Sequence, residues 1–342
     1  MATQVSTVTE VPFGPPSVSA PGKAIDASAH TYLQSRDTVV IPPSELQPHC
    51  HHLEKHVTEE VNAYFLKHWR FPNEKSRKKF VHAGFSTVTC WYFPTALNDR
   101  IHFACRLLTL LFLIDDLLEH MSLAEGEAYN NKLMPIARGD VLPDRHVPVE
   151  YIMYDLWESM RACDREMANQ VLEPVFTFMR AQTDPTRLRP MDLKEYFEYR
   201  ERDVGKGLLA ALMRFCMGLR MSTEELAIAR PVDMNCSKHL SIINDIWSFE
   251  KELLASKTAH KEGGALCTGV AIFAEGAEVS TSAAKRVLYA LCREWEERHK
   301  ELEAEALAQR NTPELRAYLK GLEHQMSGNE MWSRTTLRYR DR

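Results

Sequence analysis

Apolar residues recur with helical spacing from about residue 51 to the end of the chain. In the segment 51–69 they fall three or four positions apart, on one face of an amphipathic helix, at Leu53, Val57, Val61, Tyr64 and Phe65. The segment 100–121 is apolar almost all round, which is typical of a buried central helix. No stretch alternates apolar and polar residues with a sustained period of two, so the pattern predicts helices and no sheet.

Glycine and proline divide the remaining apolar pattern into further helices. The pattern predicts helices at 149–182 in one or two pieces, at 191–221 with a kink near Gly205 or Gly207, at 223–256 with a break at Pro231, at 282–309 and at 313–337. It predicts polar loops at 137–148 and 257–266. The predicted fold class is therefore all-α, a helical bundle.

Residues 1–45 differ from the rest of the chain in being rich in Ser, Thr, Pro, Val and Ala. Such a segment carries little that could form a core, and we predict a disordered or loosely attached tail, with a strap that orders over the body as the alternative. No internal repeat and no change in composition follows residue 50, which predicts one α-helical domain at 46–342. Helices that surround a shared central cavity would explain a domain of this size.

Composition argues against several classes of protein. The net charge is −5 and the chain has no long basic stripe, so we predict no nucleic-acid partner. The longest apolar run, near Leu107–Ile114, is far shorter than the ~20 residues of a membrane span. The N-terminus has no charged segment followed by an apolar one, so secretion is not expected.

The eight cysteines are scattered along the chain, and none forms a C-x-x-C pair, which argues against a zinc cluster. Several lie inside helical patterns, as buried free thiols do. A reducing compartment fits this use of cysteine, and we predict a cytoplasmic location. A monomer and a homodimer are both compatible with the sequence pattern.

Asp115, Asp116 and Glu119, here called the acidic cluster, end the apolar run of the central helix. At about 100° per residue, they share one stripe of that helix with the deeper side chains Phe112 and Leu108. Carboxylates stacked in this way repel one another, and the negative end of the helix dipole adds to the repulsion. A hard divalent cation such as Mg²⁺ would relieve both effects. The alternative is a solvated helix end whose acids are surface charge.

Asn244, Ser248 and Glu252, here called the oxygen ridge, are spaced four residues apart in NDIWSFEKE. They fan over only about 80° of one helix face. Their amide, hydroxyl and carboxylate oxygens form a ligand set suited to Mg²⁺. The alternative is the polar face of an amphipathic helix, although Asn and Ser are poor helix formers in mid-helix. Two such clusters on separate helices could hold several Mg²⁺ ions between them, and metals held in this way usually bind a polyanion such as diphosphate.

The motifs DDLLE and NDIWSFEKE resemble the aspartate-rich and NSE/DTE motifs of class I terpene cyclases, in the same order and at a similar separation. The flanking sequences ALNDRIHFACRLLTLLFLIDDLLEHMS, GEAYNNKLMPIARGDVLPDR and YDLWESMRA extend the resemblance to fungal members, from about residue 50 to the end. The resemblance implies a helical bundle around a central active-site cavity and three Mg²⁺ ions. It also implies conversion of farnesyl diphosphate, through germacrene A, to a bicyclic sesquiterpene and diphosphate.

The resemblance also assigns roles to single residues of this chain. It implies metal ligands at Asp115, Asn244, Ser248 and Glu252, with Asp116, Glu119 and Asp203 as their supporting neighbours. It implies diphosphate contacts at Arg200, Lys206, Lys251, Arg338 and Tyr339, where the planar fork of arginine suits phosphate oxygens. It implies an aromatic pocket of Tyr92, Phe112, Phe178 and Trp332, whose ring faces stabilise a carbocation without attacking it. We expect closure by the segment 256–266 and the C-terminal segment to exclude water.

Three alternatives compete with this interpretation. The same machinery with other pocket side chains would form a different sesquiterpene. A chain-elongating prenyltransferase would carry aspartate-rich motifs on both helices, and the oxygen ridge counts against it. A non-catalytic helical binding module would have no use for Arg200 and Arg338 together with the oxygen ridge. For any single lysine or aromatic residue named above, an ordinary surface or core position is the simpler explanation without the resemblance.

Overall fold

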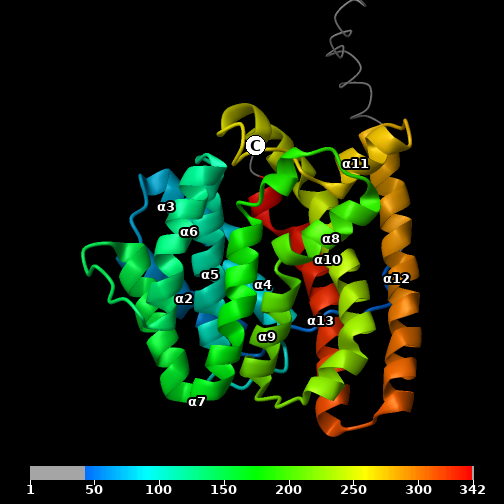
Figure 1. Cartoon of the computed structure of the whole chain (residues 1–342), viewed down its shortest axis with the longest axis horizontal. Helices are drawn as coiled ribbons and strands as arrows, with labels where there is room; N and C mark the ends of the chain where they lie inside the picture. The colour runs from blue at the N-terminus through cyan, green and yellow to red at the C-terminus, as the bar shows by residue number, and fades with distance from the viewer. Residues whose placement is uncertain (1–42, 341–342) are drawn as a thin grey trace, which may run out of the picture. The chain divides into compact units, whose positions relative to one another are not determined.

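Figure 1 shows the computed structural model, which describes residues 43–340. This range contains helices and no β-strand, so the predicted all-α fold class is confirmed. Its α-helices are α2 Glu54–His68, α3 Glu74–Ala83, α4 Phe85–Tyr92, α5 Ile101–Leu118, α6 Leu123–Arg138, α7 Pro148–Ala181, α8 Leu193–Asp203, α9 Lys206–Met217, α10 Thr223–Thr258, α11 Gly269–Gly276, α12 Thr281–Gln309 and α13 Pro313–Thr335. Its short 3₁₀ helices are η1 Pro185–Leu188 and η2 Leu337–Tyr339.

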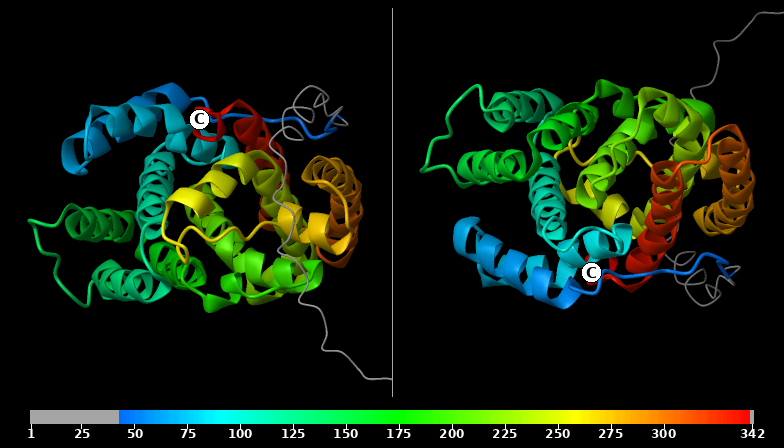
Figure 2. Two further views of the ribbon diagram at one scale, coloured as in Figure 1. Left: turned by 90° about the horizontal axis from the view of Figure 1, so that it is seen from above. Right: turned by 90° about the horizontal axis from the view of Figure 1, so that it is seen from below.

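Helix α5 is the buried helix that the sequence predicts. Most of its side chains from Ile101 to Ile114 are buried, and it packs against α2, α4, α7 and α9. A second group of contacts joins α10 to α12 and α13. Viewed along the helices in Figure 2, α5, α7, α8, α10 and α13 form a ring. This ring places the ends of α5 and α10, which carry the two oxygen-rich motifs, around one space.

Helix α13 crosses α4 at very short range because a glycine stands at the contact. A Cβ atom on Gly328 would lie 2.4 Å from the backbone oxygen of Trp91, so any larger residue would push the two helices apart. One turn further along α13 comes Trp332, and Tyr92 ends α4. The close crossing therefore brings these two aromatic side chains to the same side of the bundle.

The predicted helix at 191–221 is divided into α8 and α9 rather than kinked. Gly205 stands between them with φ of +73°, in the left-handed region that glycine enters without a steric penalty. Helix α8 starts at a capping box, in which the Asp192 and Glu195 side chains each accept a backbone N–H of the other residue. The break turns the chain directly after Asp203, the last residue of α8.

The predicted break at Pro231 is wrong, because α10 runs without interruption from Thr223 to Thr258. Proline has no N–H, so the carbonyl of Ala227 loses its helical partner at this point. Both Ala227 and Pro231 are exposed, so that carbonyl faces water instead of a dry core. The packing of the long following segment against α12 and α13 then outweighs the local cost of the proline.

The other predicted boundaries agree with the structure. Helix α7 has non-helical backbone angles at Asp164, so the segment 149–182 consists of two helical pieces. The predicted loop at 137–148 matches the connection from α6 to α7, which begins at Gly139 with φ of +85°. The predicted loop at 257–266 connects α10 to α11. Helices α3, α4, α6 and α11 were not among the predicted segments. None of the helices among residues 43–340 combines the length and apolar character that a membrane crossing requires.

Most of the predicted tail, residues 1–42, lies outside the described residues. Its last part is described and contacts α12. Ser44 Oγ donates a hydrogen bond to Glu296 Oε1 (2.9 Å), and the backbone N–H of Glu45 donates to Glu296 Oε2 (3.3 Å). The neighbouring Leu46 is buried. These residues therefore cover a buried carboxylate of α12.

Candidate active site

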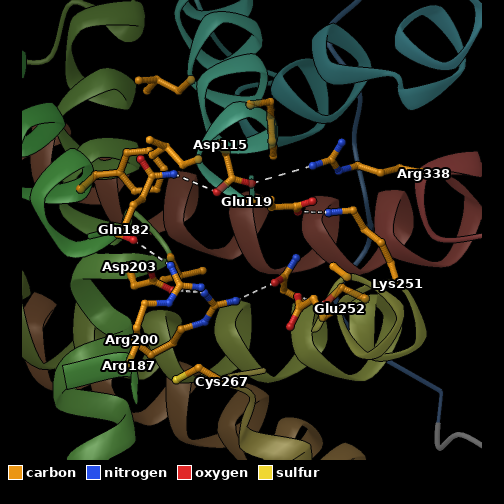
Figure 3. A pocket seen from close by; sticks show the side chains of 18 of the residues that line it. Asp115, Glu119, Gln182, Arg187, Arg200, Asp203, Lys251, Glu252, Cys267 and Arg338 are labelled. Carbon is orange, nitrogen blue, oxygen red and sulfur yellow. Dashed lines mark hydrogen bonds and ion pairs between the residues drawn. The ribbon is translucent and has the colours of Figure 1, made fainter. Parts of the chain in front are cut away.

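A cavity of about 200 Å³ opens inside the ring of helices. One part of its lining is apolar: Tyr92, Leu108, Leu111, Phe112, Leu118, Phe178, Val204, Leu208, Leu209, Ala255 and Trp332. The other part is polar: Asp115, Glu119, Gln182, Arg187, Arg200, Asp203, Asn244, Ser248, Lys251, Glu252, Asn329, Arg338 and Tyr339. The segment that leads to α11 adds Gly263, Gly264, Ala265 and Cys267. Figure 3 shows many of the polar side chains pointing toward one another across this space.

The four aromatic residues predicted for the pocket all line the cavity. Phe112 stacks on Phe85, with ring centroids 4.5 Å apart and planes inclined by 11°, and lies 6.2 Å from the ring of Trp332. The hydroxyl of Tyr92 donates a hydrogen bond to Asn329 Oδ1 (2.8 Å), and burial raises the pKa of this hydroxyl. The aromatic rings together present a surface that can stabilise a positive charge while offering it no free nucleophile.

The acidic cluster stands where α5 ends, and one carboxylate oxygen of each member lies within 4.8 Å of the others. Asp115 and Glu119 line the cavity. The Asp115 side chain keeps 42% of its surface accessible because it borders the cavity. Even so, the surrounding protein, followed by the charge of Glu119, raises the pKa of Asp115 to about 6. A cation bound between these carboxylates would oppose that shift.

Asp116 differs from the other two members of the acidic cluster in that it does not line the cavity. It accepts two hydrogen bonds from the Arg338 guanidinium, at 2.7 and 3.2 Å. Burial raises the pKa of Asp116, but Arg338 more than offsets this and holds the pKa below its usual range. The guanidinium also lies over the rings of Phe85 and Phe112, 5.1 and 5.6 Å from their centroids. Asp116 therefore fixes a cation at the edge of the cavity.

The oxygen ridge faces the cavity from α10, as its spacing predicts. Ser248 Oγ donates a hydrogen bond to Glu252 Oε1 (2.6 Å), so two members of the ridge already converge. The amide of Asn244 donates to the hydroxyl of Tyr339 (2.8 Å), and its oxygen accepts from Arg200 (2.7 Å). Figure 3 shows Glu252 across the pocket from Asp115. The amide, hydroxyl and carboxylate oxygens fit a hard divalent cation.

The predicted diphosphate-binding cations Arg200, Lys251 and Arg338 all line the cavity, and each of them pairs with an acid. The Arg200 guanidinium binds the carboxylate of Asp203, which the sequence predicts as a neighbour of the metal ligands. Lys251 Nζ pairs with Glu119 across the end of α5. Charges held in this way are oriented before a ligand arrives, which lowers the cost of binding an anion.

Lys206 is the one predicted diphosphate contact that the structure places elsewhere. It begins α9, and its ammonium group is buried against Asp233 Oδ1 of α10 at 2.7 Å. The hydroxyl of Tyr318 donates to both oxygens of the same Asp233, at 3.0 and 2.8 Å. The turn at Gly205 directs the side chain of Lys206 into the contact between α9, α10 and α13 and away from the cavity. The prediction for Lys206 is therefore corrected.

Several lining residues have no signal in the helical pattern. Gln182 follows α7, and its Nε2 donates a hydrogen bond to Asp115 Oδ1 (2.9 Å). Arg187 belongs to η1, and Asn329 holds the hydroxyl of Tyr92. Cys267 lies beyond the loop that follows α10, where burial raises the pKa of its thiol to about 12. Gln182, Arg187 and Cys267 lie at a helix end, in a short 3₁₀ helix or in a loop, and reach the site through the path of the chain, so helical spacing does not reveal them.

The loop that follows α10 is held against the end of α5. A Cβ atom on Gly263 would lie 2.2 Å from the backbone oxygen of Leu118, so only glycine permits this approach. The backbone N–H of His260 donates to the oxygen of Glu119 (3.2 Å), and Glu262 accepts from the N–H of Leu123 (3.0 Å). The predicted closing segment therefore borders the cavity beside the acidic cluster.

Comparison with known proteins agrees with this site. Residues 106–298 match the family model "Terpene synthase family 2, C-terminal metal binding", and this range contains both the acidic cluster and the oxygen ridge. The aristolochene synthase of Aspergillus terreus is 70% identical over 299 residues, which are 87% of this chain and 93% of that protein. The chain belongs to the terpene synthase family.

Further relatives support the same assignment. An aristolochene synthase of Penicillium roqueforti is 58% identical over 304 residues, 88% of this chain and 89% of that protein. The crystal structure of the aristolochene synthase from Penicillium roqueforti has a TM-score of 0.78, with 56% identity over 87% of this chain and all of that one. The resemblance to class I terpene cyclases is thereby confirmed. As a terpene synthase, the protein depends on a divalent metal and acts on a diphosphate ester.

Proposed function

We propose that this terpene synthase converts farnesyl diphosphate to aristolochene through germacrene A, with diphosphate as the second product. The supporting observation is the 70% identity to the Aspergillus terreus aristolochene synthase, which extends over 87% of the chain. The cavity fits the proposal, because a carbon skeleton can occupy its aromatic part while the polar part receives the diphosphate. A cyclase needs this division, since one end of the substrate becomes a cation and the other an anion.

We propose that Mg²⁺ is the metal and that three ions take part. Asp115 would hold metal from α5, and Asn244, Ser248 and Glu252 would hold it from α10. The donor set supports this choice, because all of these ligand atoms are oxygens. Burial, followed by the charge of Glu119, raises the pKa of Asp115, and a bound cation would oppose that shift. When bound, the metal would supply positive charge that stabilises the departing diphosphate.

We assign the diphosphate contacts to Arg200, Lys251, Arg338 and Tyr339. All four side chains line the polar part of the cavity. The guanidinium groups offer paired N–H donors that match phosphate oxygens, and Lys251 offers a point charge. Lys206 is left out, because its ammonium group lies in the contact of α9 with α10.

In the apolar part of the cavity, the protein acts chiefly as a template. Tyr92, Phe112, Phe178 and Trp332 would hold the farnesyl chain folded and stabilise positive charge through their ring faces. Tyr92 is a poor base, because burial raises the pKa of its hydroxyl, which therefore keeps its proton and donates a hydrogen bond to Asn329. We therefore assign the base to the bound diphosphate. The loop with Gly263 would exclude water during the reaction.

The same site is compatible with two other enzyme activities. A different sesquiterpene would follow from small changes in the pocket, because a few side chains direct the folding of the chain. A chain-elongating prenyltransferase is disfavoured, since α10 presents the oxygen ridge in place of a second aspartate-rich motif.

Incubation of the purified protein with farnesyl diphosphate and Mg²⁺, followed by gas chromatography with mass spectrometry, tests the proposal. We expect aristolochene as the main product, one diphosphate released for each hydrocarbon formed, and no reaction after removal of the metal by a chelator. A different bicyclic hydrocarbon would overturn the product but keep the cyclase. A longer prenyl diphosphate, formed after addition of isopentenyl diphosphate, would establish the elongase instead.

We also make proposals about the domain organisation, the cellular location and the oligomeric state of the protein. We propose that residues 46–342 form one catalytic domain and that residues 1–45 form an attached tail. We propose a cytoplasmic location, supported by eight cysteines that are all free thiols. A homodimer is the remaining proposal, and measurement of the molar mass in solution by light scattering tests it.

A further inference from the structure

The cations that line the cavity are not equivalent. Four of them border it: Arg187, Arg200, Lys251 and Arg338. The last three each have a carboxylate partner, in Asp203, Glu119 and Asp116 respectively. Within residues 43–340, no carboxylate oxygen lies within the 4.0 Å ion-pair distance of an Arg187 nitrogen. Arg187 therefore brings a positive charge to the cavity that no side chain neutralises by contact.

The surroundings of Arg187 make the lack of a carboxylate partner costly in free energy. Its Nη1 donates a hydrogen bond to the backbone oxygen of Gln182 (2.7 Å), while its Nε is buried and has no hydrogen-bond partner in the described part of the chain. A guanidinium group carries five N–H donors, and a buried donor left without an acceptor costs free energy. An anion that entered the cavity would supply both the missing charge and the missing acceptor.

The position of Arg187 on the chain directs it into the polar part of the site. Figure 3 shows Arg187 and Arg200 extending into the pocket from the same side. Burial lowers the pKa of Arg187, but Tyr199, Asp203 and Asp115 more than offset this, so the guanidinium stays charged. The carbonyl that it binds belongs to Gln182, whose amide in turn holds Asp115. An anion at Arg187 would thus be coupled to the carboxylate proposed for metal.

We propose that Arg187 is a further diphosphate-binding residue, which contacts the anionic end of the substrate and of the diphosphate product. This inference rests on the proposed function, since it names another contact of the same site. Arg187 differs from the other cations in lacking an acid that would have to be displaced or shared. No carboxylate therefore has to release the Arg187 guanidinium before a ligand binds, whereas Lys251 is in contact with Glu119.

The test compares Arg187→Gln with a matched control, Arg189→Gln. Arg189 is exposed and lies two residues further along, and its side chain donates only to Thr186 Oγ1 (3.2 Å), so its loss changes the net charge equally without touching the cavity. Inhibition by inorganic diphosphate is measured at fixed Mg²⁺ beside KM and kcat for farnesyl diphosphate. We expect Arg187→Gln to weaken diphosphate binding about 10- to 100-fold, as loss of a charge-assisted hydrogen bond does, and Arg189→Gln to change it less than about twofold.

A second variant, Arg187→Lys, separates ligand binding from the role of Arg187 in closing the turn onto Gln182. It keeps the charge, so diphosphate affinity should recover to within about fivefold of the unchanged protein. Diphosphate affinity within twofold of the unchanged protein in Arg187→Gln would overturn the inference. If Arg187→Gln and Arg187→Lys lose diphosphate affinity equally and show the same drop in melting temperature, the inference is also overturned. The cause would then be the disrupted turn onto Gln182. Failure of the unchanged protein to turn over farnesyl diphosphate would instead overturn the proposed function.

Discussion

Two groups of acidic side chains in this protein look alike in the spacing of their ligand atoms and differ in what surrounds them. The acidic cluster borders the cavity on α5. The second group, here called the rear cluster, joins His239 of α10, Arg293 and Glu296 of α12 and Glu330 of α13. In each group, ligand atoms of three residues lie within 4.8 Å of one another, as a metal site requires. Residue type and spacing in three dimensions therefore do not distinguish them.

The two clusters differ in the cations that contact their carboxylates. In the rear cluster the Arg293 guanidinium pairs with both carboxylates, at 2.5 Å for Glu330, and His239 lies 3.3 Å from Glu296. Ser44 covers Glu296 from outside. In the acidic cluster, by contrast, Asp115 has an arginine nitrogen no closer than 3.9 Å and faces a cavity. The rear cluster is structural, because one internal guanidinium holds both of its carboxylates. In the acidic cluster Arg338 and Lys251 pair with Asp116 and Glu119, but Asp115 faces the cavity and leaves room for a cation from solution.

The largest expected effect comes from removing the internal cation. Arg293→Met should lower the free energy of unfolding by about 3–5 kcal/mol, because it leaves the carboxylates of Glu296 and Glu330 buried without their guanidinium. Urea unfolding followed by circular dichroism measures the change. The control Arg298→Met, on the exposed face of α12, should cost less than about 1 kcal/mol. Equal stability of the two variants would show that Arg293 does not hold the rear cluster together.

The next effect should fall on catalysis and leave the fold intact. Glu252→Gln should lower turnover about 100- to 1,000-fold, the usual cost of losing one group that stabilises charge in the transition state. Its free energy of unfolding should stay within about 1 kcal/mol of the unchanged protein. The control Glu250→Gln removes an exposed acid of the same helix, paired with Lys285 of α12, and should keep turnover. Near-normal rates in Glu252→Gln would mean that the oxygen ridge does not hold metal.

The smallest expected effect is on the pH dependence of the free energy of unfolding, which should have opposite signs for groups near the two clusters. Burial lowers the pKa of His299, beside the rear cluster, to about 4 from an ordinary value of 6.5. The unfolded chain therefore gains a proton first, and stability that is complete above pH 6.5 is lost as the pH falls toward 4, by about 3 kcal/mol in all. His299→Leu should flatten this decline in urea unfolding between pH 7 and pH 4.5. An unchanged decline would exclude His299 as its source.

The acidic cluster should show the opposite slope in the metal-free protein. The pKa of Asp115 is raised from 3.8 to about 6, so stability is lost as the pH rises through that window. Asp115→Asn should remove this loss, and the same measurement of unfolding against pH tests it. An unchanged loss of stability as the pH rises through this window in Asp115→Asn would exclude Asp115 as its source.

Much of this protein could be predicted from sequence because its helices are strongly patterned. The apolar run of α5 and the spacing of Asn244, Ser248 and Glu252 depend only on the 100° turn of a helix. The failures came where a single residue was judged without its surroundings. Pro231 does not break α10, because its exposed position tolerates the lost hydrogen bond. Lys206 turns away from the cavity, because Asp233 and the turn at Gly205 direct it elsewhere.

By itself, the sequence determined the helical class, the two oxygen-rich faces and the residues able to hold metal, since these follow from periodicity along one chain. Only the tertiary structure decided which charges reach the cavity. It placed Arg187 there without an acid, paired Asp116 with Arg338, and gave the rear cluster its own cation in Arg293. The physical reason is that the free-energy cost of a buried charge, and its availability to a ligand, depend on which groups contact it and on its access to solvent. Helices that are far apart in the sequence provide those contacts together.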